Sequence, residues 1–200
     1  MKLVAGLGNP GAEYARTRHN AGFMALDILA AESGERWKSG FDGLCCRMAC
    51  GTEQVLLLKP ATFMNRSGQA LAQAMRFHGL GIADVLVVVD DIHLPCGTIR
   101  LRAGGSSGGH NGLADVQRHM EQFVPGDPQG AARYARLRIG VDEPGRVPLE
   151  AYVLSAFSPG QWAQMQVALK QAADAVQCWA CHGVEKAMNR FNVGNEGCGK

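Results

Sequence analysis

Short apolar runs recur along the chain, separated by longer stretches in which apolar residues return with helical spacing. The runs at 3–5 and 85–89 predict strands. The second run contains only Val and Leu, which is typical of a central strand that is buried on both faces. Further strands are predicted at 44–50, 55–59, 98–102 and 135–141.

The helical stretches lie between these runs. An amphipathic segment at 21–32 stops before a glycine, and a second segment, capped by Asn65 or Ser67, ends at His78. Ser158 followed by Pro159 is a strong helix start. Later helices are predicted at 111–122, 159–182 and 184–191, with a Pro/Gly-rich surface loop at 124–133.

The alternation of strands and helices predicts an α/β fold with a twisted, mixed and largely parallel sheet flanked by helices. The 200 residues, 46% of them hydrophobic and 19% charged, are enough for one well-filled core. We expect a single domain over residues 1–192 and a flexible, polar, Gly-rich tail at 193–200.

The net charge of +2 gives no general case for nucleic-acid binding, but the charges are unevenly placed. Between residues 92 and 141 there are six arginines against three acids. Arginine suits bidentate phosphate contacts, whereas the alternative is a solvated face with local ion pairs. No apolar run approaches the length of a membrane span, and no signal peptide precedes the first strand, so a cytoplasmic protein without membrane contact is expected.

Seven cysteines are expected to be free thiols in that compartment. The segment Cys178-Trp-Ala-Cys181-His182 spells a haem-attachment motif, but it lies in a long amphipathic helix. A zinc site would need a second pair of ligands, and Cys45-Cys46 lacks the spacing. Buried core thiols are the favoured interpretation.

The glycine-rich stretch after the first strand forms a tight turn with Asn9 at its tip, and His19 follows just before a helix. Open α/β sheets place their sites at this carboxyl end of the strands. Gly6-x-Gly8-x-x-Gly11 also matches a dinucleotide fingerprint. That match is weak, because the helix starts about ten residues late and Asp27, at the spacing of a ribose-binding acid, lies inside it.

Polar residues recur at other predicted strand ends and helix starts. Together they form the set Asn9, His19, Asn65, Asp90, His110 and Asn111. An imidazole that takes a proton, a carboxylate that orients it and amides that bind a peptide-like group suit a water nucleophile. Each residue alone has a structural alternative, as a cap, an ion-pair partner or a hydrogen-bonded core histidine.

Four motifs, in order, resemble the bacterial-type peptidyl-tRNA hydrolases over residues 2 to about 192. They are G-L-G-N-P-G-x-x-Y-x-x-T-R-H-N-x-G, K-P-x-T-F-M-N-x-S-G, D-D-x-x-L-P-x-G and G-G-H-N-G-L-x-D. The resemblance implies a monomer that hydrolyses the ester between a peptide and the tRNA 3′-terminal ribose, so that tRNA is recycled from aborted translation. It implies no metal, cofactor or protein partner. The substrate partner would be peptidyl-tRNA, contacted at its acceptor end and its peptide.

The resemblance also implies roles for individual residues. His19 would be the general base, Asp90 would hold and polarise it, and Asn9 would recognise the peptide. The remaining implied contacts are Tyr14, Phe63, Asn65 and Asn111 at the substrate end, Met64 packing the crevice, His110 supporting its loop, and Arg102 with Arg138 as a basic pair for the tRNA acceptor end.

The chain departs from the family pattern in two places. The loop at 124–133 is longer than usual, and Asp142-Glu143 is acidic for a segment beside an RNA-binding face, so the crevice cover at 142–149 is not assigned. Two other functions stay open from sequence. One is an RNA-binding, splicing-cofactor-like relative that does not catalyse hydrolysis, and the other is an enzyme with a nucleotide cofactor.

Overall fold

The structure is a computed structural model in which residues 1–192 are described; the tail predicted at 193–200 lies outside the described residues. The described chain forms one mixed sheet in the order β2-β3-β4-β1-β5-β7-β6. The strands are β1 (Lys2–Gly6), β2 (Lys38–Gly40), β3 (Gly43–Cys50), β4 (Glu53–Pro60), β5 (Val85–Asp91), β6 (Ile99–Arg102) and β7 (Ala135–Gly140). The strands β4, β1, β5 and β7 run parallel, whereas the pairs β2–β3, β3–β4 and β6–β7 are antiparallel.

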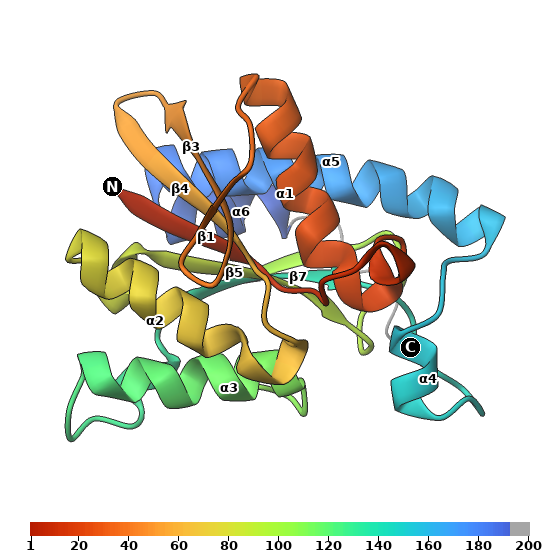
Figure 1. The fold of residues 1–200 in the computed structure, drawn as a ribbon. Coiled ribbons are helices and arrows are strands. Elements are labelled where there is room, and N and C mark those ends of the chain that lie inside the picture. The colour runs from red at the N-terminus through yellow and green to blue at the C-terminus, as the bar shows by residue number, and fades with distance from the viewer. Residues whose placement is uncertain (193–200) are drawn as a thin grey trace.

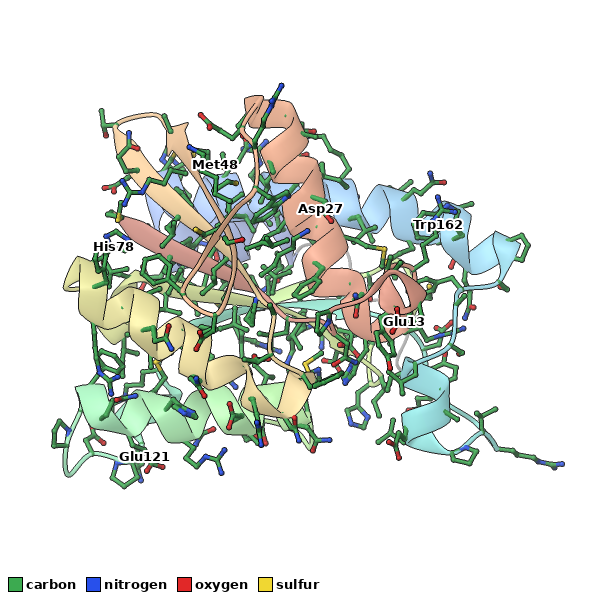
Figure 2. The ribbon with its side chains drawn as sticks, in the orientation of Figure 1. Glu13, Asp27, Met48, His78, Glu121 and Trp162 are labelled. Atoms are coloured by element: carbon green, nitrogen blue, oxygen red, sulfur yellow. The ribbon has the colours of Figure 1, made fainter. Side chains whose placement is uncertain are left out.

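Helices cover both faces of the sheet (Figure 1). They are α1 (Ala21–Ser33), α2 (Ser67–His78), α3 (Asn111–Met120), α4 (Leu149–Val153), α5 (Pro159–His182) and α6 (Val184–Phe191). The helices α1, α5 and α6 pack on one face, and α2 and α3 pack on the other. In Figure 2, Asp27 on α1 and Glu121 just after α3 lie on opposite sides of the sheet.

Alternating side chains of β5 fill the two cores that result. Leu86 and Val88 join the core under α1 and α5, and Val87 and Val89 join the core under α2 and α3. Every residue of β5 is buried, which confirms the central strand predicted from its unbroken Val and Leu run.

The predicted strands and long helices are confirmed, with shifts of a few residues at their ends. Helix α1 ends at Gly34 in the left-handed conformation, and Ser158 caps α5 in a capping box that Gln161 completes. Two short elements, β2 and α4, were not predicted, because three to five residues carry too little periodicity.

The predicted cap of α2 is wrong. The N-cap position is Arg66, without a side-chain hydrogen bond, and a 3₁₀ turn at Met64–Arg66 precedes the helix. The Ser67 hydroxyl instead donates to the Met64 carbonyl oxygen at 2.9 Å, inside that turn. Asn65 is therefore exposed and available for other contacts.

The loop at 124–133 is only partly a surface loop. It contains a 3₁₀ turn at Gly130–Ala132, and Ala131 is fully buried in the core under α2 and α3. Asp142 does not face the crevice as a free acid: its carboxylate accepts hydrogen bonds from the Cys96 backbone N–H at 2.7 Å and from the Gln161 amide at 2.9 Å. Asp142, the first residue of the acidic pair at 142–143, is therefore held by hydrogen bonds within the fold.

The thiols differ more than the sequence predicted. Cys46, Cys50, Cys96 and Cys178 are buried, as expected, but Cys45 is half-buried and Cys181 is exposed, and Cys198 lies outside the described residues. The prediction of uniformly buried core thiols is therefore wrong for Cys181. The end of α5, where Cys181 lies, is exposed to solvent.

Within residues 1–192, none of the helices has both the length and the apolar composition that a membrane span needs.

One glycine brings the first helix onto the strand ends. A Cβ atom at Gly22 would lie 2.4 Å from the Val88 carbonyl oxygen and 2.5 Å from the Leu7 nitrogen. Only glycine permits this approach, which places the residues just before α1 over the carboxyl ends of β1 and β5. The register pairs Gly6 with Val88, so these two strands end together.

Candidate active site

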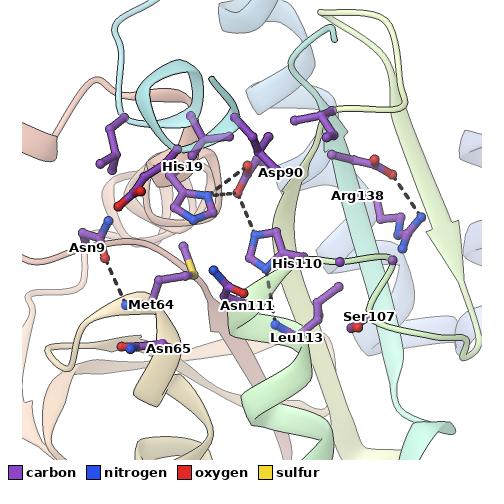
Figure 3. Close-up of a pocket in the computed structure, with 18 of the residues that line it drawn as sticks. Asn9, His19, Met64, Asn65, Asp90, Ser107, His110, Asn111, Leu113 and Arg138 are labelled. Carbon is purple, nitrogen blue, oxygen red and sulfur yellow. Dashed lines mark hydrogen bonds and ion pairs between the residues drawn. The ribbon is translucent and has the colours of Figure 1, made fainter. Parts of the chain in front are cut away.

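A cavity of about 690 Å³ opens at this edge of the sheet, where Asn9, His19, Asp90, His110 and Asn111 meet (Figure 3). Asn9 and His19 come from the segment between β1 and α1, Asp90 from the end of β5, and the other two from the start of α3. Phe63, Met64 and Asn65 line the cavity from the segment between β4 and α2. The carboxyl edge of the sheet thus gathers all six polar residues of the predicted set.

His19 is oriented by Asp90. Its Nδ1 lies 2.9 Å from Asp90 Oδ1 and 3.0 Å from Oδ2. The carboxylate is only 3% exposed, so it must be hydrogen-bonded, and an ionised carboxylate can only accept. Nδ1 therefore carries the proton, and Nε2 of the neutral ring is left with a free lone pair at the cavity.

His110 is held in the opposite tautomer. Its Nδ1 accepts hydrogen bonds from the backbone N–H groups of Gly112 at 3.1 Å and Leu113 at 3.3 Å, as the N-cap of α3. The proton must then sit on Nε2, which donates to Asp90 Oδ1 at 3.1 Å. His110 thus caps α3 and also contacts Asp90, a contact that the sequence did not predict.

Asp90 is the electrostatic centre of the site. Burial by itself raises the pKa of this carboxyl group, but the electrostatic interaction with the rings of His110 and His19 and their hydrogen bonds outweigh burial and hold the pKa well below its usual range. Asp90 is therefore ionised at neutral pH. It favours a positive charge on His19 when that ring takes up a proton.

Ligand atoms of His19, Asp90 and His110 lie within 4.8 Å of one another, which raises the question of a metal. A cation on Nε2 of His110 would move that ring's proton to Nδ1, which already faces two backbone N–H groups. The donor set thus fits a carboxylate that accepts two imidazole N–H groups better than it fits a metal ion.

The position of Asn9 is fixed by a residue that sequence reasoning did not assign. The side chain of Asn20 accepts from the Asn9 backbone N–H at 2.9 Å and donates to the Asn9 carbonyl at 3.0 Å. Asn9 Oδ1 in turn accepts from the Met64 backbone N–H at 3.0 Å. Its amide nitrogen has no partner among residues 1–192, so it can donate to a ligand. The sequence carried one signal for the role of Asn20, because this amide residue comes directly after His19.

The wall opposite α2 is formed by α4, which sequence reasoning left unassigned. Leu149, Glu150 and Val153 line the cavity from this helix, and Leu154 lines it from the position directly after the helix. Leu149 and, across the cavity, Phe63 at 60% exposed are large apolar side chains open to solvent. Such an apolar rim around polar groups is typical of a binding crevice.

Arg18 anchors this wall beside His19. Its guanidinium is buried, donates to the Ser155 carbonyl at 3.1 Å and the Ala156 carbonyl at 2.8 Å, and stacks 4.2 Å from the Tyr152 ring centre. The sequence predicted no role for this arginine, although it stands in the first motif. A contact to residues about 137 positions away could not be seen in the sequence.

Two predicted residues do not line the cavity. Tyr14 lies in a 3₁₀ turn (Ala12–Tyr14) and is not among the lining residues, and Arg102 is exposed on the edge strand β6. Arg138 does line the cavity, and its guanidinium lies 3.1 Å from the Asp91 carboxylate. Arg138 is thus both at the crevice and ion-paired, although the sequence suggested these as two separate alternatives.

Four of the six clustered arginines share one face of the sheet. The β6–β7 register pairs Arg100 with Arg138 and Arg102 with Arg136, and residues two apart on a strand point the same way. Arg136 is buried and donates to the Ser106 carbonyl at 2.7 Å, which ties the Gly-rich loop to β7. Burial lowers the pKa of Arg136.

The glycine fingerprint has a packing explanation. A Cβ atom at Gly6 would lie 2.5 Å from the Gly22 carbonyl oxygen, and one at Gly8 would lie 2.7 Å from the Phe23 ring. These glycines let α1 approach the first strand, and α1 begins ten residues after Gly11. Asp27 pairs with Lys59 at 2.6 Å on the surface. None of these positions resembles a ribose-binding arrangement.

Comparison with known proteins agrees on one family. The family model described as peptidyl-tRNA hydrolase matches residues 3–198. The chain is 45% identical to a peptidyl-tRNA hydrolase of Symbiobacterium thermophilum, with 96% of this chain and 99% of the relative covered. It is 42% identical to one of Rhodopirellula baltica, with 96% and 98% covered. The crystal structure of the Acinetobacter baumannii peptidyl-tRNA hydrolase has a TM-score of 0.87 and 36% identity, covering 96% of this chain and 95% of that one.

Proposed function

The chain belongs to the peptidyl-tRNA hydrolase family and hydrolyses peptidyl-tRNA, and from this premise we propose which of its residues carry out the reaction. The observation that carries the proposal is the pair His19–Asp90, joined at 2.9 Å, whose free Nε2 lies at the cavity. A neutral imidazole with an anionic partner is suited to act as a general base at neutral pH.

In the proposed reaction, Nε2 of His19 takes a proton from water as the water oxygen attacks the carbonyl carbon of the ester. Asp90 stabilises the imidazolium that forms. The C–O bond to the 3′-terminal ribose oxygen then breaks, and the proton passes from His19 to this oxygen. The products are a tRNA with a free ribose hydroxyl and a peptide carboxylic acid, which loses the second proton of the water to solvent and becomes a carboxylate.

Amide groups hold the substrate and its developing negative charge. The free amide nitrogen of Asn9 donates to the peptide next to the ester, and Asn65 and Asn111 reach the same space from two helix starts. Preorganised N–H donors are effective here, because they need no reorganisation as the charge develops. Phe63, Met64 and the apolar face of α4 contact the peptide side chains and the terminal base.

The four arginines on one face of β6 and β7, here called the arginine face, are Arg100, Arg102, Arg136 and Arg138. Two of them, Arg102 and Arg138, are proposed to bind the RNA part of the substrate. Arg138 stands at the cavity and Arg102 stands farther out on the edge strand. In this proposal, Arg138 lies near the ester and Arg102 lies along the acceptor stem. The pair contacts backbone phosphates of the tRNA acceptor end.

The decisive experiment compares cleavage of an N-blocked aminoacyl-tRNA by the parent chain and by His19→Asn. The matched control is His93→Asn, because His93 also lines the cavity but has no contact with Asp90. We expect a loss in rate on the order of 10²–10⁴ for His19→Asn with tRNA binding retained, and a loss of less than about threefold for the control. Turnover by His19→Asn close to that of the control would reject the assignment.

The same assay separates the second candidate function. A non-catalytic RNA-binding protein would bind tRNA and leave the ester intact. The likeness to enzymes along the whole chain disfavours it.

A further inference from the structure

A second cavity, of about 640 Å³, is lined by the end of β3 and the end of α5. Figure 1 shows these two segments at the opposite end of the sheet, near the start of the chain. Residues from β3 and the last turns of α5 line it, among them the three thiols Cys50, Cys178 and Cys181. Met48, labelled in Figure 2, marks its β3 side. The hydrolytic reaction described above uses none of these residues.

Two of the thiols are in direct contact. Cys50 is the last residue of β3, Cys181 lies in the last turn of α5, and their Sγ atoms are 2.7 Å apart. The Cys181 thiol also lies 3.2 Å from the Cys50 carbonyl oxygen. Contact this close brings the two sulfurs inside their van der Waals separation, while a disulfide bond, at about 2.03–2.05 Å, is shorter still.

Their surroundings differ. Cys181 is exposed at the cavity, whereas Cys50 is only 8% exposed. Burial, together with the neighbouring Cys181 thiol, raises the pKa of Cys50 to about 12. Cys181 is therefore the thiol that meets a reagent first, and Cys50 is the thiol behind it.

We propose that Cys50 and Cys181 are a reversible redox pair that closes to a disulfide by exchange with a small-molecule disulfide. The Cys181 thiolate attacks one sulfur of the reagent RS–SR, forming a Cys181–SR bond and releasing one RS⁻. Cys50, losing its proton, then attacks Cys181 Sγ, forming the Cys50–Cys181 bond and releasing the second RS⁻. The protein loses two electrons and two protons, and the reagent leaves as two RSH molecules.

Cys178 is not the partner in this reaction. It stands three residues before Cys181 on the same helix, where Cβ atoms are about 5–6 Å apart. A disulfide needs Cβ atoms about 3.5–4.5 Å apart. Among residues 1–192, the sulfur–sulfur contact joins Cys181 to Cys50 and not to Cys178.

The bond would fasten the end of the β3–β4 hairpin to the end of α5. These segments are 131 residues apart in sequence, so the cross-link would remove much freedom from the unfolded chain. The active site lies at the other edge of the sheet, so turnover should not change. We expect the oxidised chain to unfold at a higher temperature while hydrolysing peptidyl-tRNA at the same rate.

The test uses the full chain, treated with a chelator and then with oxidised glutathione. We expect the loss of two free thiols per chain, restored by dithiothreitol, and a rise in melting temperature. Proteolysis with cleavage after Trp179 separates Cys178 from Cys181, so that mass spectrometry can identify the linked peptide. Cys181→Ser should abolish both the thiol loss and the shift, and the matched control Cys178→Ser should keep both.

Three results would overturn the proposal. The first is a Cys181–glutathione adduct that persists without an internal bond. The second is a bond from Cys181 to Cys178 or Cys198. The third is zinc bound to the untreated chain, with thiols that do not react until a chelator removes the zinc. Repeating the assay in a Cys198→Ser background identifies a bond to the tail. Cys50→Ser should also abolish the thiol loss and the shift in melting temperature. If that variant does not fold, Cys181→Ser decides alone, because Cys181 is exposed.

Discussion

Among residues 1–192, two buried aspartates, Asp90 and Asp115, each contact a histidine ring, and of the two only Asp90 lines the large cavity. Asp90 is 3% exposed and accepts from His19 and His110 at the mouth of the large cavity. Asp115 is 4% exposed, lies beside His119, ion-pairs with Arg118 and accepts from the Gly68 backbone N–H at 2.8 Å.

The two sites differ in two ways. One is the environment of the histidine nitrogen that does not contact the aspartate, and the other is the type of side chain that pairs with the aspartate. Asp115 has a guanidinium partner and a backbone donor that joins α3 to the start of α2, so its charge is used in packing. Within residues 1–192, Asp90 accepts from two imidazoles, whose charge can change, and the second ring nitrogen of one of them, His19, is left free at the cavity. A buried Asp–His contact is thus a site only where a titrating ring faces a space for substrate.

The largest effect is expected on the rate of ester cleavage, and it should distinguish His19 from His119. His19→Ala should reduce the rate of ester cleavage by on the order of 10²–10⁴, because it removes the imidazole that we propose takes the proton from water. His119→Ala should leave the rate close to that of the parent. Steady-state rates on one blocked substrate measure both. Equal losses of rate in the two variants would show that activity depends on the contact with a buried acid and not on the position at the cavity.

The next effect separates the two acids. Asp90→Asn should slow turnover by on the order of 10–10²-fold and shift the kinetic pKa downwards, because the imidazolium loses its anionic partner. Asp115→Ala should instead lower the free energy of unfolding by about 1–3 kcal/mol, because it leaves the Gly68 N–H without its acceptor. A pH–rate profile and a denaturant titration on each variant test this. An unchanged profile for Asp90→Asn would contradict its pairing with His19.

The lowered pKa of Asp90 also predicts a pH dependence of stability. A carboxyl group whose pKa is lower in the folded chain stabilises the fold above its unfolded pKa of about 4, and this contribution is lost as the pH falls through the folded value. The stability difference between the parent and Asp90→Asn should therefore shrink from pH 7 to pH 3. Chemical denaturation at both values measures it, and a difference that grows on acidification would reverse the sign we assign.

A smaller effect concerns substrate choice. Asn9→Ala should narrow the preference for blocked over unblocked aminoacyl-tRNA, because a charged α-amine is rejected where the amide expects a peptide group. Asn20→Ala should act in the same direction, since Asn20 holds the Asn9 backbone by two hydrogen bonds. Rates on both substrates give the ratio. An unchanged ratio with both rates lower would make the two amides structural.

The smallest effect is expected from the arginine face. Arg102→Ala or Arg138→Ala should weaken binding of full tRNA substrates and reduce the slope of log K against log salt by about 0.7–0.9 for each phosphate that is no longer neutralised. Cleavage of a blocked aminoacyl group on a short 3′ fragment should change little. If Arg138 only pairs with Asp91, its removal should lower the melting temperature and affect both substrates alike.

Much of this protein follows from its sequence alone. The Val and Leu run of β5, the Ser158–Pro159 start of α5 and the glycine after α1 each act on neighbouring residues, so their local pattern predicts the element. Because parallel strands end at one edge, polar residues after those strands could also be expected to meet there. His19, Asp90 and Asn111 could therefore be assigned to one site from their positions in the sequence.

Only the tertiary structure decided the contacts between distant segments. The tautomer of His110, the clamp of Asn20 on Asn9, the anchoring of α4 by Arg18 and the Cys50–Cys181 pair all depend on the packing of one element against another. It also left Tyr14 and Arg102 outside the cavity. Periodicity reports which face of an element is buried, but the position along a neighbouring element that each side chain meets is set by close packing across the whole core.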